Sequence, residues 1–421
     1  MKLSAPFQNR TKLYLNLLAL SLLFLPFRHN ISSVFGIILF LFFFIDKENT
    51  VKEKCKRLLK NKVAILTLSI YLLHLLGLIY TQNFKYASLD LEIKLPLFII
   101  PFVIFSERKL TSENLNYVFK FFTIGNLAAL LFCIVFAVVR LYLTKISTVL
   151  FYNEFSRFMH PSYFSLYIGF NCVFIFNKIA HLNPNDVKYK LQLLRNLVIA
   201  SFFIIGTLML SSKAGILITG ITLLFFALKE LIYKKVILTV FLSFILLILI
   251  AVISIFKNNI VALSRFEAAQ KEITTKTNTV TETNGSSSSR LLIWQSSKSV
   301  LVKNLAFGVG TGDIKDELIK QYKKVNFLHG VENENNCHNQ YLQFFILFGI
   351  GGGFLFLFSL IYPTYISIKN RDTIYLYFIF FIATNMLVES MLETKAGVEF
   401  FAIFNAILLN YSFKKVNYNA L

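Results

Sequence analysis

The sequence predicts an all-α polytopic membrane protein, and three observations support this fold class. Of the 421 residues, 56% are hydrophobic and only 15% are charged, and the mean hydropathy is +0.63. The chain carries 47 Phe residues, more rings than a soluble fold of this size could bury. Twelve apolar runs recur at lengths typical of membrane-spanning helices. Together these properties exclude the soluble domains that a chain of this length would otherwise suggest.

Each apolar run is expected to form one helix across the membrane, and several helices must extend into flanking polar residues to reach the ~20 residues that a crossing needs. The runs occupy residues 13–27, 31–45, 63–80, 89–105, 118–139, 161–177, 195–212, 214–233, 236–256, 341–366, 374–392 and 396–413. Residues 1–256 would therefore hold helices one to nine, residues 257–340 one large periplasmic loop, and residues 341–421 helices ten to twelve. The first run is expected to remain as a signal anchor, because no small-residue cleavage pattern follows it.

The basic residues are distributed unevenly between the two ends of these helices. With a cytoplasmic N-terminus, the short inner segments hold 23 Lys and Arg residues and the short outer segments hold seven. The positive-inside rule then places both termini in the cytoplasm. This asymmetry explains most of the net charge of +21, so the basic composition does not indicate a nucleic-acid partner.

The large outer loop divides into a low-complexity part and a more ordered part. Residues 274–289 are rich in Thr, Asn and Ser, cannot bury a core, and are expected to be mobile. From Arg290 onward, apolar residues at 291, 294 and 301 predict a helix that lies on the membrane surface. Glycines at 308, 310 and 312 follow. Without a preceding buried strand they favour a tight loop over a dinucleotide-binding turn.

His338 is the sharpest candidate for chemistry, because it stands where the outer loop becomes the tenth helix. The positive end of the helix disfavours a charged imidazole, so a neutral ring could accept a proton near pH 7. An equally supported interpretation is an interfacial His that ties the loop to the helix. The neighbouring Asn339 and Gln340 could orient the ring or bind sugar hydroxyls.

Two cations could bind phosphate. Arg290 could hold two phosphate oxygens in a planar fork, or could anchor the helix to lipid headgroups. Lys213 occupies a very short outer turn beside two serines, although lysines in turns are usually just solvated. Arg157 and His160, at the outer start of the sixth helix, could contact substrate, but a helix cap in the interfacial belt is the favoured interpretation.

Four ionisable residues lie within the apolar runs and need partners: His74, Lys94, Glu389 and Glu399. The simplest pairing joins Lys94 to a glutamate. Metal and thiol chemistry have little support, because the carboxylates near the outer face have no His nearby in sequence and the four cysteines are scattered. We therefore expect no metal and no other cofactor.

The order of several motifs resembles the O-antigen ligase family, whose members also include O-antigen polymerases and protein O-oligosaccharyltransferases. The motifs are Ser-Ser-Lys-Ala-Gly at 211–215, Ser-Arg-Leu-Leu-Ile-Trp at 289–294, Phe-Gly-Val-Gly-Thr-Gly at 307–312, His-Asn-Gln-Tyr-Leu-Gln at 338–343 and Phe-Gly-Ile-Gly at 348–351. The family commonly has arginine where this chain has Lys213, and lysine keeps the charge but loses the fork.

This resemblance implies a GT-C-like glycosyltransferase of the bacterial inner membrane with a periplasmic active site. It would move a glycan from undecaprenyl diphosphate to a lipid A-core hydroxyl, without metal and with inversion. By position, His338 would activate the acceptor, and Arg290 and Lys213 would bind the diphosphate. A polymerase with the same donor is the first alternative. A polysaccharide transporter or flippase is the second, but the suggestive groups cluster at one face rather than along helix midsections.

Overall fold

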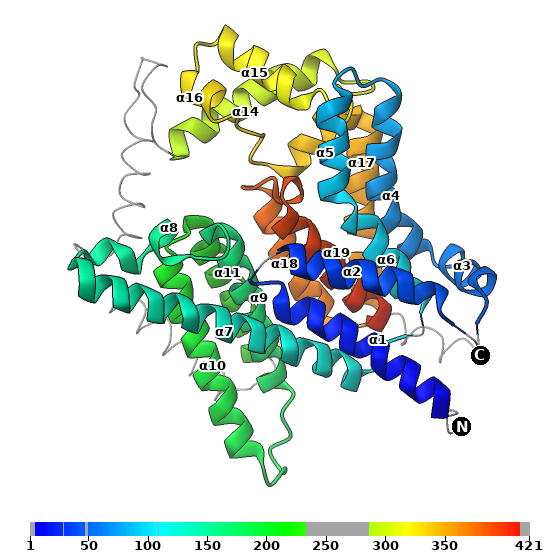
Figure 1. Ribbon diagram of the computed structural model, residues 1–421, viewed down its shortest axis with the longest axis vertical. Coiled ribbons are helices and arrows are strands. Elements are labelled where there is room, and N and C mark those ends of the chain that lie inside the picture. The colour runs from blue at the N-terminus through cyan, green and yellow to red at the C-terminus, as the bar shows by residue number, and fades with distance from the viewer. Residues whose placement is uncertain (1–4, 28, 47–48, 108, 233–285, 413–421) are drawn as a thin grey trace. The chain divides into compact units, whose positions relative to one another are not determined.

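The computed structural model describes residues 5–27, 29–46, 49–107, 109–232 and 286–412 (Figure 1). It is all-helical, with 81% helix and no strand in these residues. The chain divides into two compact units, Met1–Phe122 with Glu272–Leu421 (unit 1) and Thr123–Lys271 (unit 2).

Unit 1 carries the two terminal thirds of the chain. Its helices are α1 (Ala5–Phe24), α2 (His29–Phe44), α3 (Val51–Leu59), α4 (Lys62–Leu76), η1 (Gly77–Ile79), α5 (Phe84–Lys94), α6 (Pro96–Ser106), the first part of α7 (Ser112–Thr144), α14 (Ser286–Lys303), α15 (Ile314–Lys324), α16 (Leu328–Glu332), α17 (Gln340–Lys369), α18 (Thr373–Met386), η3 (Met391–Glu393) and α19 (Lys395–Ser412). Unit 2 holds the rest of α7, η2 (Ser147–Leu150), α8 (Tyr152–Phe155), α9 (Pro161–Ala180), α10 (Tyr189–Leu210) and α11 (Lys213–Ile232).

Helices cover every predicted span except 236–256, which lies outside the described residues. Within the described part, five helical segments are long and apolar enough to cross a membrane: Lys62–Ile79, Ser112–Thr144, Pro161–Ala180, Tyr189–Leu210 and Gln340–Lys369. Shorter apolar helices cover Ile31–Phe44, Lys213–Leu228 and Thr373–Met386. The described residues are therefore consistent with a polytopic membrane protein, whereas the count of twelve spans and the place of the large loop stay predictions.

Three boundaries differ from the sequence-based expectation. The run 89–105 forms two helices, α5 and α6, and Pro96 is the first residue of the second, because proline lacks the amide that would continue the first. The run 374–392 is helical only to Met386, so Glu389 lies in a connection rather than in a spanning helix. The four serines at 286–289 begin α14, whereas residues 257–285, including most of the expected mobile run, lie outside the described residues.

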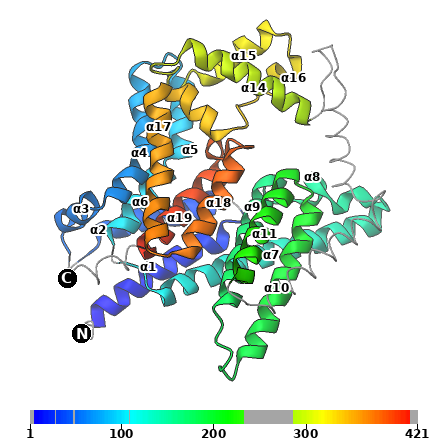
Figure 2. The same ribbon diagram turned by 180° about the vertical axis from the view of Figure 1, so that it is seen from behind.

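The core of unit 1 surrounds α19, which is buried along almost its whole length. It packs against α6, α18, α2 and α5. Aromatic rings fill the spaces between these helices: Phe404 lies 4.7 Å from Phe122 and 4.8 Å from Phe400, centroid to centroid. Edge and tilted ring pairs of this kind add to the stability gained by burial. Figure 2 shows α19 behind α17 and beside α18.

Helices α14, α15 and α16 form a layer beside the start of α17 (Figure 1). In α14 the buried stripe runs through Ser289, Ile293, Ser297 and Val300, which recur at helical spacing. Leu291, expected on an apolar membrane face, is instead 49% exposed. The helix itself was predicted correctly, but its buried face packs on protein, because α15 and α17 supply the apolar partners.

A buried ionic network joins α1 and α3 to the residues that follow α2 and α6. Lys54 Nζ lies 3.1 Å from both Asp46 Oδ2 and Glu107 Oε1, and only 1% of the Lys54 side chain is exposed. Arg10 joins the same carboxylates, with 2.7 Å from Nη2 to Glu107 Oε1. The network fixes α3 and the end of α6 against α1, because buried charges of opposite sign stay paired.

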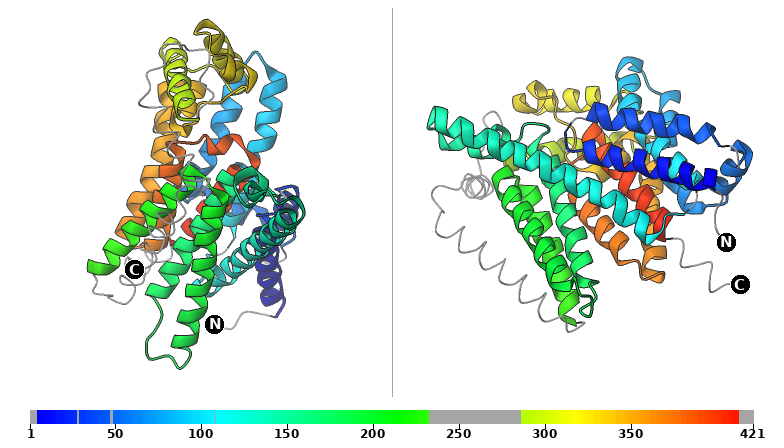
Figure 3. Two further views of the ribbon diagram at one scale, coloured as in Figure 1. Left: turned by 90° about the vertical axis from the view of Figure 1, so that its left-hand side faces the viewer. Right: turned by 60° about the horizontal axis from the view of Figure 1, so that its bottom comes forward.

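Unit 2 is built around α9, which packs on both α10 and α11 (Figure 3). Nearly all residues of α9 are buried, and the polar side chain of Asn171 is also 0% exposed. Pro161 occupies the first turn of α9, as the sequence suggested, because its fixed φ suits a helix start.

Candidate functional site

His338 lies immediately before α17, at the place that the sequence indicated. Its backbone has a φ of +44°, and its amide donates to Asn336 Oδ1 at 3.0 Å. Asn339 is the N-cap of α17 and accepts from the Leu342 amide at 2.9 Å. Cys337 is fully buried, and burial raises the pKa of its thiol to about 12, so this neighbour is a neutral packing group.

The connection between α18 and α19, residues 387–394, is bound to the start of α17. The Asn339 amide donates to Ser390 Oγ at 3.1 Å, and Asn339 Nδ2 donates to the Leu387 carbonyl at 3.1 Å. The Leu392 amide donates to Gln340 Oε1 at 2.6 Å, and Gln340 is 0% exposed. The two side chains expected to contact sugar hydroxyls are therefore engaged with this connection.

Glu389, in the same connection, brings His338 and Arg290 together. Its Oε1 lies 3.5 Å from His338 Nδ1, and its Oε2 lies 3.9 Å from Arg290 Nη2. The three side chains are 18%, 27% and 31% exposed in the order Glu389, His338, Arg290. Three elements, α14, the approach to α17 and the α18–α19 connection, thus supply one partly exposed site with an imidazole, a guanidinium and a carboxylate.

The arrangement fixes which imidazole nitrogen is available. His338 Nδ1 is buried and faces Glu389, without a hydrogen bond of normal length. A carboxylate beside Nδ1 favours the tautomer with the proton on that nitrogen and leaves Nε2 as the acceptor. Such contacts are often long in ligand-free enzymes and shorten in the reacting complex. The arrangement thus combines an imidazole nitrogen suited to accept a proton with a neighbouring guanidinium.

The glycines at 308–312 form a tight loop, as the sequence favoured. The amides of Val309 and Gly310 donate to the carbonyls of Ile346 and Leu347, at 2.9 and 3.0 Å. Because these two amides already donate to carbonyls of α17, they are not available to bind phosphate. The partner helix is kinked at Gly349, where φ is +64° and ψ is −164°, values that favour glycine.

Three of the predicted site residues, Arg157, His160 and Lys213, belong to unit 2. Lys213 is the first residue of α11 and follows Ser211, whose φ is +48°. The Arg157 guanidinium lies 4.5 Å from the centroid of the Phe136 ring. His160 caps α9, because its Nδ1 accepts from the Ser162 amide at 3.3 Å. The capping interpretation of His160 is thus confirmed, while the approach of Lys213 to Arg290 and His338 stays a prediction.

The ionisable residues of the apolar runs have partners that differ in detail from the expected ones. Lys94 pairs with a glutamate, as predicted, but the glutamate is Glu393, and Asp90 is a second partner. Glu399 accepts a hydrogen bond from Ser33. Glu389 belongs to the candidate site. Its polar neighbourhood, Glu-Ser followed by Glu-Thr-Lys at 393–395, was the signal that could have indicated a connection there.

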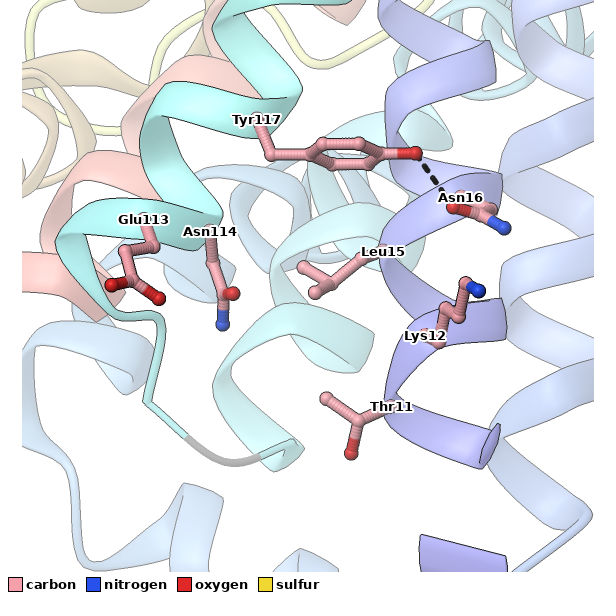
Figure 4. A pocket seen from close by; sticks show the side chains of 7 residues that line it. All are labelled: Thr11, Lys12, Leu15, Asn16, Glu113, Asn114 and Tyr117. Carbon is pink, nitrogen blue, oxygen red and sulfur yellow. Dashed lines mark hydrogen bonds between the residues drawn. The ribbon is translucent and has the colours of Figure 1, made fainter. Parts of the chain in front are cut away.

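A separate pocket of about 440 Å³ lies between α1 and the start of α7 (Figure 4). Across it, the Tyr117 hydroxyl donates to Asn16 Oδ1 at 2.8 Å. Lys12, Glu113 and Asn114 add further polar groups. None of the candidate site residues lines this pocket. Among the described residues, no three His, Cys, Asp or Glu side chains are grouped as metal ligands.

The apolar helices, with His338, Glu389 and Arg290 grouped at helix ends, are typical of a helical membrane protein with an ionisable site. Residues 197–357, which are less than half of the chain, match the family model described as O-Antigen ligase, so this segment is similar to that family. The match confirms the resemblance inferred from the motifs. No curated protein matches the sequence. The matched segment contains Lys213, Arg290 and His338, and Glu389 lies beyond it.

This similarity supports, at a coarse level, a glycosyltransferase-like enzyme of the O-antigen ligase and polymerase kind. Substrates of such enzymes are glycans and lipid-linked molecules in general terms. The finer assignment of donor, acceptor and mechanism depends on the site.

Proposed function

We propose that the protein transfers a glycan from undecaprenyl diphosphate to a sugar hydroxyl of the lipid A core, at the periplasmic face of the inner membrane. The observation that carries this proposal is the grouping of His338, Glu389 and Arg290 at helix ends, in a chain that contains the O-antigen ligase segment. A lipid-linked sugar diphosphate brings its own activated bond, so the reaction needs no nucleotide in the outer compartment.

The proposed chemistry is a single displacement at the anomeric carbon. The acceptor hydroxyl oxygen attacks that carbon, its proton passes to His338 Nε2, and the bond between the anomeric carbon and the diphosphate oxygen breaks. The configuration at the carbon is inverted, and undecaprenyl diphosphate leaves. Glu389, 3.5 Å from Nδ1, orients the ring and stabilises the imidazolium that forms.

Cations offset the charge that develops on the departing diphosphate. Arg290 presents a planar guanidinium beside the imidazole, and its fork fits two phosphate oxygens. In this proposal Lys213 supplies a second positive charge, as a point charge rather than a fork. Positive groups placed where negative charge develops are a large source of rate enhancement. Arg157 and His160 stay candidates for further substrate contacts.

A polymerase that uses the same donor and a growing glycan as acceptor is the second candidate, because the family includes both activities. Deletion of the gene separates the two. Loss of a ligase leaves the lipid A core bare while long chains accumulate on the lipid carrier. Loss of a polymerase leaves cores that bear a single repeat unit. Unchanged lipopolysaccharide and unchanged carrier-linked glycan would contradict both.

A further inference from the structure

A cluster of four ionisable side chains is buried beside the candidate site. Lys94 Nζ lies 2.5 Å from Asp90 Oδ1 and 3.0 Å from Glu393 Oε2, and Asp90 Oδ2 lies 3.1 Å from His74 Nδ1. The side chains of Lys94 and His74 are 0% exposed, and those of Asp90 and Glu393 are at most 8% exposed. The proposed reaction uses none of these groups.

The cluster is connected to two of the three segments that build the site, the α18–α19 connection and α17, and to the glycine loop. Glu393 ends the connection that carries Glu389, four residues away in the sequence. The His74 ring packs edge-on against Phe344 and Phe348 of α17, with centroids 5.5 and 4.9 Å apart. The His74 carbonyl accepts from Thr311 Oγ1 at 2.7 Å, which holds the glycine loop.

The connection is therefore held from two sides. On one side, next to His338, Gln340 Oε1 accepts from the Leu392 amide and Asn339 Nδ2 donates to the Leu387 carbonyl. On the other side, Lys94 binds the Glu393 carboxylate. Between these attachments, Glu389 has little freedom to move relative to the imidazole. Apolar packing alone would bury the same helices but would not fix the direction of this short connection, whereas an ion pair of defined geometry does.

We propose that Lys94, through its ion pair with Glu393, is a positioning residue that holds the Glu389 connection against His338. This inference rests on the proposed function for its catalytic consequence, but the positioning itself is measurable without substrate. Misplacement of a reacting group by about 1 Å can lower a rate by roughly 10²-fold, so a cluster remote from the acceptor can still control transfer.

The chain supplies a matched control. Lys54 is also a fully buried lysine between two carboxylates, Asp46 and Glu107, but it belongs to α3, and neither carboxylate lies in the connection that carries Glu389. Removing either lysine takes one cation from a pair of buried carboxylates, which is costly for the fold in both places. A second basic neighbour remains in each network: Arg10 beside Asp46 and Glu107, and His74 beside Asp90. Only the Lys94 variant should alter the site.

The first measurement is amide hydrogen exchange of the purified full-length protein, followed in the peptide that spans residues 387–394. For Lys94→Met and the milder Glu393→Gln, we expect exchange there to become at least ~10-fold faster, because the connection opens locally. Lys54→Met should change this peptide by less than about twofold. Unchanged exchange in a folded Glu393→Gln protein overturns the inference, whether or not Lys94→Met folds.

The second measurement is glycan transfer in membrane vesicles that contain the host's lipid-linked glycan and lipid A core. Glu393→Gln should lower kcat by roughly 10-fold or more with little change in KM, and should add almost nothing in a Glu389→Gln background. Fully additive losses would show a general stability effect and overturn the catalytic part. If the wild-type protein transfers no glycan but the exchange result holds, the proposed function fails and the positioning stands.

Discussion

Replacing Glu389 by glutamine tests the role of this carboxylate most sharply, because the side chain keeps its shape and loses its charge. A carboxylate 3.5 Å from an imidazolium, at an effective dielectric constant of about 20, gains roughly 4–5 kcal/mol of Coulomb energy. Partial exposure, 18% for Glu389, and the remaining amide dipole reduce the net effect. We therefore expect a loss of about 2–3 kcal/mol, which is roughly a 30- to 150-fold decrease in kcat/KM.

The assay is transfer of radiolabelled lipid-linked glycan in vesicles, at matched protein levels, with Glu334→Gln as the control. Glu334 is also ion-paired, with Lys315 of α15, but its side chain is 54% exposed. Exposed pairs contribute little, so the control should stay within about twofold of the wild type. A Glu389→Gln protein with wild-type transfer would refute the reasoning.

Three further predictions follow from other contacts. Arg290→Lys keeps the charge but loses the fork, so kcat/KM should fall about 10- to 100-fold, measured in the same vesicles; equal rates would contradict a bidentate role. Gly349→Ala should lose at least ~2 kcal/mol of stability in detergent melting, because the added Cβ would clash with the Ala306 carbonyl; Gly351→Ala, where a Cβ would meet open space, should not. Cys337 should resist an impermeant maleimide at about pH 8, because only ~10⁻⁴ of a thiol with a pKa of about 12 is thiolate, whereas Glu334→Cys should react.

The helices could be predicted from the sequence because each apolar run carries its own signal. Local chemistry also indicated the start of α9 at Pro161 and the position of His338 before α17. These features depend on residues that are neighbours in the chain, so no tertiary information is needed. The break at Pro96 was equally local, but the continuous hydropathy across it suggested one helix.

Glu389 shows why the rest of the site was harder to predict. Its run is apolar enough to suggest a span to residue 392, but the helix ends at Met386. The next carbonyl, that of Leu387, is bound by Asn339, and the Leu392 amide is bound by Gln340, 52 residues away. Contacts over such separations leave no periodic pattern in the sequence. Glu389 could be recognised as a neighbour of His338 only once the fold had brought the two segments together.

The buried ionic cluster shows the same limit: the sequence indicated that Lys94 has a partner but not which residue the partner is. The sequence showed that Lys94 needed a glutamate partner, since an isolated charge in an apolar run is costly. It could not choose among glutamates, because Glu393 lies 299 residues away and had not been counted within a span.

The most direct test of the whole account is glycan transfer by the purified protein with His338→Ala, measured together with binding of the undecaprenyl diphosphate-linked donor. The account predicts that transfer falls by at least ~10²-fold while the donor still binds, because Arg290 is intact and only the proton acceptor is lost. Full transfer by a stable His338→Ala protein would contradict it.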